Sequence, residues 1–223
     1  MSKKKHPPRI PRDANGFRAQ DLRLLPRGAW WVRRWIQAIE AMRLGARAGR
    51  GRVYAEQGQV TELHVSGTHV EATVLGARPD PYTVKIDFAP IRSAASGERP
   101  PANGQPDGIL GAMTVGRILA GEMPTVVEER FAMKGLSLYP TIGVDRFWCS
   151  CPDWSKPCKH IAAVLYLLGD VLVREPALLL RLRGVTLVPE VDAADPALPL
   201  WKGQVKFEDA LTKIYRRVGL KGR

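Results

Sequence analysis

The chain has 223 residues, 45% of them hydrophobic, and a formal net charge of +12. This length and apolar content exclude a disordered chain and suit one larger or two small globular domains. No apolar run approaches the roughly 18 residues of a membrane helix, and no apolar segment of a secretion signal follows the basic N-terminus. We therefore expect an intracellular, cytoplasmic protein with reduced thiols and no membrane partner.

The positive charge is concentrated near the N-terminus. Residues 1–60 hold 14 Lys and Arg against four Asp and Glu, a net charge of +10, which leaves +2 for the other residues. Such a basic arm attracts polyanions by releasing their condensed counterions; a solvated tail that maintains solubility is the alternative. Residues 1–28 are rich in Pro, Lys and Arg and are predicted to form an irregular arm. We expect it to dock through a few apolar side chains: Phe17, Leu22, Leu24 and Leu25.

The first strongly periodic pattern predicts an amphipathic helix from Trp30 to about Ala48. Apolar residues recur at helical spacing, and Arg33 and Arg34 lie on the opposite face. Tryptophan faces beside arginines suit base stacking in single strands. The core spacing of Trp35 favours a place in the hydrophobic core instead.

Between Gly51 and Phe88 the sequence alternates apolar and polar residues in short runs separated by turn residues. This pattern predicts an antiparallel β-meander of about four strands. His64 and His69, on either side of one turn, are interpreted as ordinary surface or packing histidines. Together with the preceding helix, the meander is predicted to form a domain of residues 29–91.

Residues 92–108 are rich in Gly, Pro and Ser, a composition that predicts a flexible linker and a domain boundary. Beyond it we expect a helical segment at 109–184, which includes a small unit at about 143–173, and a C-terminal tail at 185–223. The spacing of apolar residues favours five helices in these segments, at 109–120, 125–133, 158–173, 176–183 and 207–218.

All three cysteines lie in one short stretch, in the pattern Cys149-x-Cys151, six intervening residues, and Cys158-x-His160. Three thiolates and one imidazole are a common tetrahedral ligand set for structural Zn²⁺. A spacing of one residue lets an extended chain turn both side chains of a pair to the same face. The apolar run after His160 predicts a buried helix, whose N-terminus favours the thiolate form of Cys158.

Other interpretations of this cluster remain open. The thiols could be free and buried beside a core histidine, or two of them could form a disulfide, which an intracellular location disfavours. A thiol redox or hydrolytic enzyme could use one of the cysteines, for instance Cys158 activated by His160. A zinc ion with four protein ligands has no open position for a reacting water. We therefore predict a structural zinc ion and no enzymatic activity.

The cluster resembles the SWIM zinc finger, in the segments Cys149-Ser-Cys-Pro-Asp-Trp154 and Pro157-Cys-Lys-His160. Softer similarity extends over about residues 27–184. It includes the helix around Trp31 and Trp35, Gly51-Arg-Val-Tyr54 at the start of a β segment, and Leu180-Arg-Leu-Arg-Gly184. The resemblance implies zinc bound by Cys149, Cys151, Cys158 and His160. It also implies DNA or protein binding and a working partnership with helicases of the Swi/Snf type.

We therefore expect an α+β fold, with an N-terminal helix and a small antiparallel β-meander followed by helices and a ββα-like finger. The expected function is a zinc-stabilised module that binds nucleic acid, protein or both in DNA transactions, with nucleoid association as a consequence. A pure protein adaptor that does not bind DNA is the alternative. Nucleic-acid contacts are predicted at four cations: Lys156, Lys159, Arg33 and Arg34.

The finger loop has little hydrophobic core of its own, so zinc binding should supply local folding free energy on the order of 10 kcal/mol. On the sequence alone, Cys158→Ala is expected to unfold residues 145–170 and to leave the β-meander largely intact.

Overall fold

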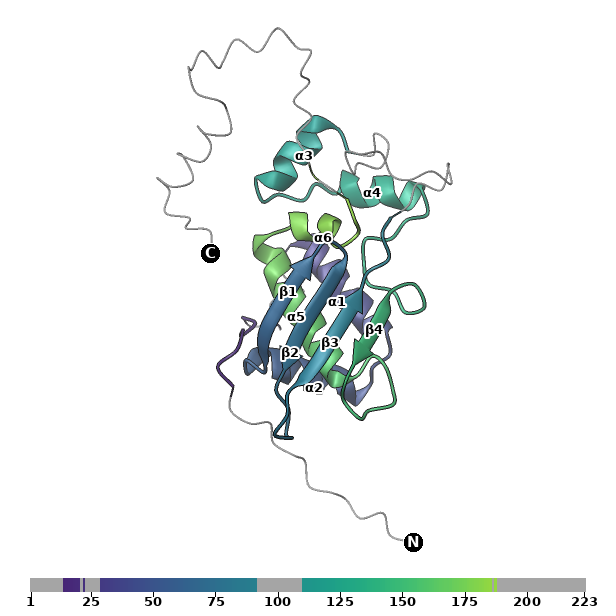
Figure 1. The fold of residues 1–223 in the computed structure, drawn as a ribbon. Helices are drawn as coiled ribbons and strands as arrows, with labels where there is room; N and C mark the ends of the chain where they lie inside the picture. Colours follow the sequence, from purple (N-terminus) through teal and green to yellow (C-terminus); the bar gives the residue numbers. More distant parts are fainter. Residues whose placement is uncertain (1–13, 21, 23–28, 92–109, 186, 188–223) are drawn as a thin grey trace, which may run out of the picture. The chain divides into compact units, whose positions relative to one another are not determined.

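The computed structural model describes residues 14–20, 22, 29–91, 110–185 and 187 (Figure 1). These described residues all belong to one compact unit. The linker predicted at 92–108 and the helix predicted at 207–218 lie outside the described residues, as do Leu24 and Leu25.

The described residues form six helices and four strands. The helices are α1 (Trp30–Ala41), α2 (Ala46–Glu56), α3 (Ala112–Leu119), α4 (Val126–Met133), α5 (Lys159–Arg174) and α6 (Ala177–Arg181). The strands are β1 (Val60–Ser66), β2 (His69–Val74), β3 (Tyr82–Asp87) and β4 (Arg146–Cys149). The predicted α+β fold is thereby confirmed. Within the described residues, no helix is both long enough and apolar enough to cross a bilayer.

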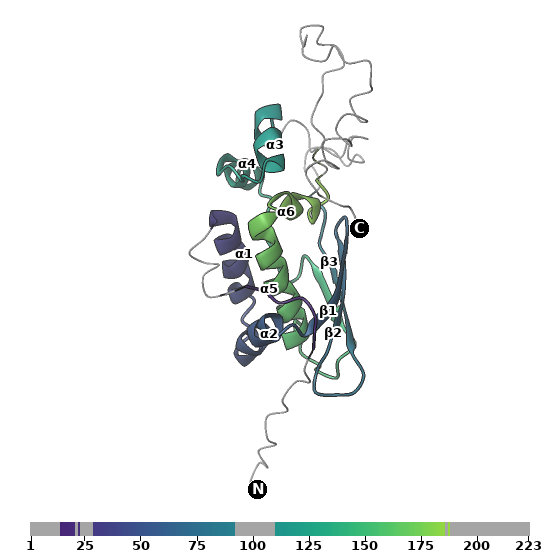
Figure 2. The same ribbon diagram turned by 90° about the vertical axis from the view of Figure 1, so that its left-hand side faces the viewer.

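The four strands form one antiparallel sheet in the order β1-β2-β3-β4. β4 comes from the predicted finger and pairs with β3, so that Cys149 lies opposite Val84. Segments on both sides of the predicted linker therefore share one sheet. Figures 1 and 2 show α1, α2 and α5 together on one face of it. The other face is more polar and includes His69, whose Nδ1 lies 2.5 Å from the Asp87 carboxylate.

Two predictions for residues 42–56 are wrong. α1 ends at Ala41, because Arg43 and Gly45 adopt positive φ angles of 52° and 57° and turn the chain. The stretch from Gly51 to Tyr54 belongs to helix α2 and does not begin a strand, so the meander has three strands before β4 joins it. Gly51, Tyr54 and Ala55 are buried on α2 at helical spacing. Packing against α5 therefore selects the helix.

Helix α5 is the central element of the hydrophobic core, because 12 of its 16 residues are buried. It packs against α1, α2, β3 and β4. The predicted core role of the α1 tryptophans is confirmed: Trp35 is buried and its Nε1 donates a hydrogen bond to the Leu165 carbonyl at 2.8 Å. Trp31 Nε1 makes the same kind of bond to Leu172 on the last turns of α5.

Part of the N-terminal arm also joins this core. Leu22 is buried, as predicted. Phe17 keeps its side chain half exposed, while its backbone N–H donates a hydrogen bond to the Val60 carbonyl at 2.7 Å. The arm thus docks partly through its main chain, along the start of β1.

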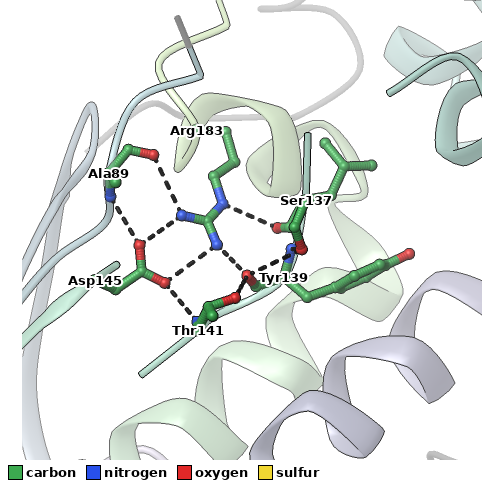
Figure 3. Close-up of polar contacts among 7 residues, drawn as sticks. Ala89, Ser137, Tyr139, Thr141, Asp145 and Arg183 are labelled. Atoms are coloured by element: carbon green, nitrogen blue, oxygen red, sulfur yellow. Dashed lines mark hydrogen bonds and ion pairs between the residues drawn. The ribbon is translucent and has the colours of Figure 1, made fainter. Parts of the chain in front are cut away.

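A buried ion pair closes the segment that runs from β4 to α6 (Figure 3). Arg183, just after α6, holds the Asp145 carboxylate with Nη1 at 2.6 Å and Nη2 at 3.2 Å. The guanidinium also donates to three backbone carbonyls, of Leu138, Tyr139 and Ala89. The carboxylate accepts hydrogen bonds from the Ala89 and Thr141 backbone N–H groups. Because these partners satisfy both charges, the pair joins three distant segments without an unpaired buried ion.

The contact between α2 and α5 can be tested with two alanine substitutions on one helix. A Cβ added at Gly51 would lie 2.5 Å from the Ala162 Cβ, whereas one added at Gly49 would meet nothing within 4 Å. We expect Gly51→Ala to lower the free energy of unfolding by about 1–3 kcal/mol through overpacking. Gly49→Ala should raise it by about 0.5–1 kcal/mol, because alanine favours the helix. Urea denaturation of the zinc-loaded protein measures both values. Equal effects would contradict the close packing.

Candidate metal centre

The four predicted ligands come from two elements that the fold brings together. Cys149 ends β4 and Cys151 follows in the next loop. Cys158 is the N-cap residue of α5, and His160 lies in the first turn of that helix. Their ligand atoms all lie within 4.8 Å of one another, and all four residues are buried. The pairing of β4 with β3 fixes one ligand pair, while the burial of α5 fixes the other.

The geometry fits a tetrahedral zinc ion. Bonds of about 2.0–2.3 Å place the ligands of such an ion roughly 3.5–3.8 Å apart. The Nδ1 atom of His160 lies 3.8 Å from the Sγ atoms of both Cys149 and Cys158. These contacts identify Nδ1 as the ligand atom of the histidine. No additional ligand is needed to complete the shell.

The second nitrogen of His160 is buried, and no hydrogen-bond partner for Nε2 is found within the described residues. Aromatic rings hold the imidazole instead: Tyr82 stacks on it with centroids 4.5 Å apart, and Tyr54 lies 5.5 Å away. A Cβ at Gly76 would lie 2.7 Å from the Tyr82 ring, so this position admits only glycine without a shift of the ring. The imidazole is therefore fixed mainly by packing.

Hydrogen bonds prepare one thiol to lose its proton before the others. The hydrogen bond from the Cys149 thiol lowers the pKa of Cys158 to about 3, against the opposing effect of burial; His160 and the backbone N–H of Ile161 contribute further. The same shared proton raises the pKa of Cys149 well above its usual range, and burial adds to that effect. A metal ion that replaces this proton would stabilise all the sulfurs as thiolates.

Of the two lysines of the finger, Lys156 is turned toward the metal centre and Lys159 toward Tyr54 of α2. Lys156 Nζ donates hydrogen bonds to the Cys149 carbonyl at 3.0 Å and to Cys151 Sγ at 3.5 Å. Lys159 Nζ donates to the Tyr54 hydroxyl at 2.7 Å. Three thiolates leave a Zn²⁺ site with a charge of about −1, and the Lys156 ammonium offsets it. The first role of Lys156 is thus to support a ligand.

The other two predicted nucleic-acid contacts lie on α1. Arg33 is exposed, and Arg34 forms an ion pair with Glu128 at 3.0 Å. Among the described residues, no hydrogen bond or ion pair joins either arginine to the finger. Arg33 and Arg34 lie between Trp31 and Trp35, which bond to Leu172 and Leu165 on the later turns of α5, whereas Lys156 and Lys159 lie just before and at the start of that helix. The described structure thus divides the four predicted cations between two places.

Sequence reasoning missed the supporting residues of the centre. Tyr54, Gly76 and Tyr82 are 78 or more residues away in sequence from His160, the ligand they contact or border, and no local pattern marks them. The ion pair of Asp145 and Arg183 had one visible signal, since Arg183 lies in the Leu-Arg-Leu-Arg-Gly stretch that carries the softer resemblance. No signal in the sequence identified Asp145 as the partner of Arg183.

Comparison with known proteins supports the same assignment. Residues 141–169 match the family model of the SWIM zinc finger, so the chain carries a SWIM zinc finger. An uncharacterized protein of Mycobacterium tuberculosis is 38% identical over 183 residues, which cover 80% of this chain. The aligned part spans 63% of the length of that relative. No solved structure matches the chain significantly. The matched segment contains all four ligands and most of α5.

The support of the Cys151 thiolate by Lys156 predicts an effect on metal affinity. We expect Lys156→Met to raise the Kd for Zn²⁺ about 10- to 100-fold, the usual cost of losing an outer-sphere hydrogen bond to a ligand. Competition with a chromophoric chelator measures this value. Lys134→Met, at an exposed position after α4, is the matched control and should leave the affinity unchanged. Equal affinities of the two variants would contradict the proposed support.

The central place of α5 widens the expected effect of losing the metal. Cys158→Ala removes a ligand at the start of the main core helix, so we expect amide protection to fall in α2 and the sheet as well as in residues 145–170. Hydrogen exchange measures this difference. Chelation of the wild-type protein should have the same effect, and added zinc should reverse it for the wild type but not for the variant. Full protection of α2 in the variant would show that the finger unfolds independently.

Proposed function

We propose that this chain is a non-catalytic interaction module, organised by zinc, that binds nucleic acid in DNA transactions. We also propose that it works with a helicase of the Swi/Snf type, for which the SWIM finger is the support. The observation that carries the proposal is the closed ligand set: four buried protein ligands within 4.8 Å of one another. Such a site stabilises the fold and leaves no position for a substrate at the metal, so we expect partners to bind on the surface of the protein.

Two features of the charge favour a nucleic acid as the partner. The chain carries a net charge of +12, and its first 60 residues account for +10. A polyanion gains affinity for such a chain through the release of counterions. The reduced thiols that the ligand set requires suit an intracellular, cytoplasmic location, where DNA is present.

A protein adaptor without DNA binding is the second candidate function. It is favoured by apolar side chains that lie half exposed around the start of the finger, at Ile142, Val144 and Trp148. An exposed apolar patch of this kind is typical of a docking surface for another protein. A thiol enzyme is disfavoured, because all three cysteines are buried and share one ligand cluster.

Elemental analysis and a DNA titration together test the proposed function. We expect one zinc per chain, and binding of fluorescent DNA that weakens on the order of 10- to 100-fold between about 50 and 200 mM salt, as for a few phosphate contacts. Fluorescence anisotropy measures the affinity at each salt concentration. One zinc without DNA binding would favour the protein adaptor. A purified chain that takes up no zinc after reconstitution would refute the metal assignment.

A further inference from the structure

We propose that the loop between the two ligand pairs and the adjacent face of α2 form one binding surface for single-stranded nucleic acid, with Trp154 as the platform on which a base stacks. This inference rests on the proposed function and names its surface. The surface consists of Arg47, Arg50, Arg78, Trp154 and Lys159.

Trp154 differs from the tryptophans of α1. Its side chain is 92% exposed, and within the described residues it makes no hydrogen bond or ring contact. By contrast, Trp30, Trp31 and Trp35 all donate hydrogen bonds to backbone carbonyls. A large aromatic side chain left almost fully in water gains free energy when another ring covers it.

The loop that carries Trp154 is fixed at both ends, by a hydrogen bond within it and by a contact from α2. Cys151 and Cys158, which belong to the buried ligand cluster, lie at its two ends, and the Asp153 carboxylate accepts a hydrogen bond from the Ser155 N–H at 3.1 Å. Arg47 of α2 donates a hydrogen bond to the Ser155 hydroxyl. The indole is therefore presented from a fixed backbone, which lowers the entropy lost when a partner binds.

Cations lie on the elements next to the loop that carries Trp154. Residues 42–55, which include most of α2, contain four arginines and no carboxylate. Arg47 already contacts the loop, and Arg50 lies one turn further along the same face of α2 and is exposed. The neighbouring buried face of α2 lies close to the start of α5, since a Cβ at Gly51 would be 3.0 Å from the Lys159 carbonyl.

A small cavity beside the loop adds further cations. It has a volume of about 180 Å³ and is bordered by Arg78, Tyr82, Asp153 and Lys159, beside the metal ligands Cys151 and His160. Asp153 is the acidic residue of this lining, and its carboxylate accepts a hydrogen bond from the Ser155 backbone N–H. Two cations and an aromatic ring around a hollow suit a phosphate group next to a stacked base.

The burial of α5 decides between single and double strands. Zinc fingers that read duplex DNA insert a helix into the major groove. Here the helix that follows the ligands has 12 of 16 residues buried and packs against the sheet and two helices. Within the described part of the finger, the loop and not the helix is therefore exposed for contact. A single exposed indole on a loop flanked by cations can stack on an unpaired base, whereas paired bases are covered by their neighbours.

Oligonucleotide titrations of surface variants test this inference. The probes are labelled oligo-dT and oligo-rU of about 15 nucleotides, within the site sizes of single-strand binders, and a duplex of equal length. We expect tighter binding of a single strand than of the duplex. Trp154→Ala should weaken it roughly 5- to 100-fold, the range found for loss of one stacked base, and Trp154→Phe should retain most of the affinity. Arg50→Gln and Arg78→Gln should weaken it severalfold and reduce the salt dependence.

Two exposed residues of β4 supply matched controls. Trp148 is 51% exposed on the opposite face of the sheet from the helices, and Arg146 shares that face. Trp148→Ala and Arg146→Gln should leave binding within about twofold of the wild type, a change below the cost of one lost phosphate contact. Each variant is first shown to hold one zinc. Tighter binding of oligo-dT or of oligo-rU identifies which kind of single strand is the ligand.

The outcomes separate this inference from the proposed function. If the wild type binds DNA but Trp154→Ala binds equally well, or if the duplex is preferred, the single-strand surface is refuted and nucleic-acid binding stands. If the β4 controls weaken binding as much as Trp154→Ala does, the surface has been misplaced. If no oligonucleotide binds the zinc-loaded wild type, both the inference and the nucleic-acid function fail.

Discussion

The structure depends on a single constraint: the helix that begins with metal ligands is also the helix that forms the core. Cys158 caps the N-terminus of α5 and His160 lies in its first turn, and the rest of α5 packs against the sheet and α1 and α2. The other ligand pair ends β4, which completes the sheet. Zinc binding therefore links the sheet edge to the core helix. Apparent binding free energies of about 10–16 kcal/mol for structural zinc match the whole stability of a typical domain, about 5–15 kcal/mol.

The buried ion pair acts on the same segment from its other end. Asp145 immediately precedes β4 and Arg183 follows α6, so the pair joins the two ends of the stretch that contains the finger. A buried ion pair adds little net stability, because desolvation consumes most of the attraction between the charges. Its geometry is demanding, however, since five backbone groups share the two side chains (Figure 3). We interpret the pair as a device that fixes the position of β4 and hence of Cys149.

The sequence revealed local features well and distant pairings poorly. The ligand spacing identified the metal centre, because four ligands within twelve residues need only a turn to meet. The core role of Trp35 followed from helical spacing. The helix at Gly51 could not be predicted in this way, because that segment is helical through contact with Ala162, more than a hundred residues away in sequence. The addition of β4 to the sheet was invisible for the same reason. Lys156 lies among the ligands in sequence and was predicted as a nucleic-acid contact; the structure shows that its ammonium also donates to the Cys151 sulfur, although the residue stays exposed.

The burial of α5 also limits where this finger can make contacts. A zinc site can expose its helix or its loop, and the choice follows from which one the hydrophobic core needs. Here the apolar residues after His160 cover the sheet, so the helix is committed to the core. The loop contains only six residues between Cys151 and Cys158, too few to bury a side chain as large as Trp154. The same distribution of apolar residues that stabilises α5 therefore places the loop, with its exposed indole, at the surface. Fold stability and the location of the binding surface thus have one common cause.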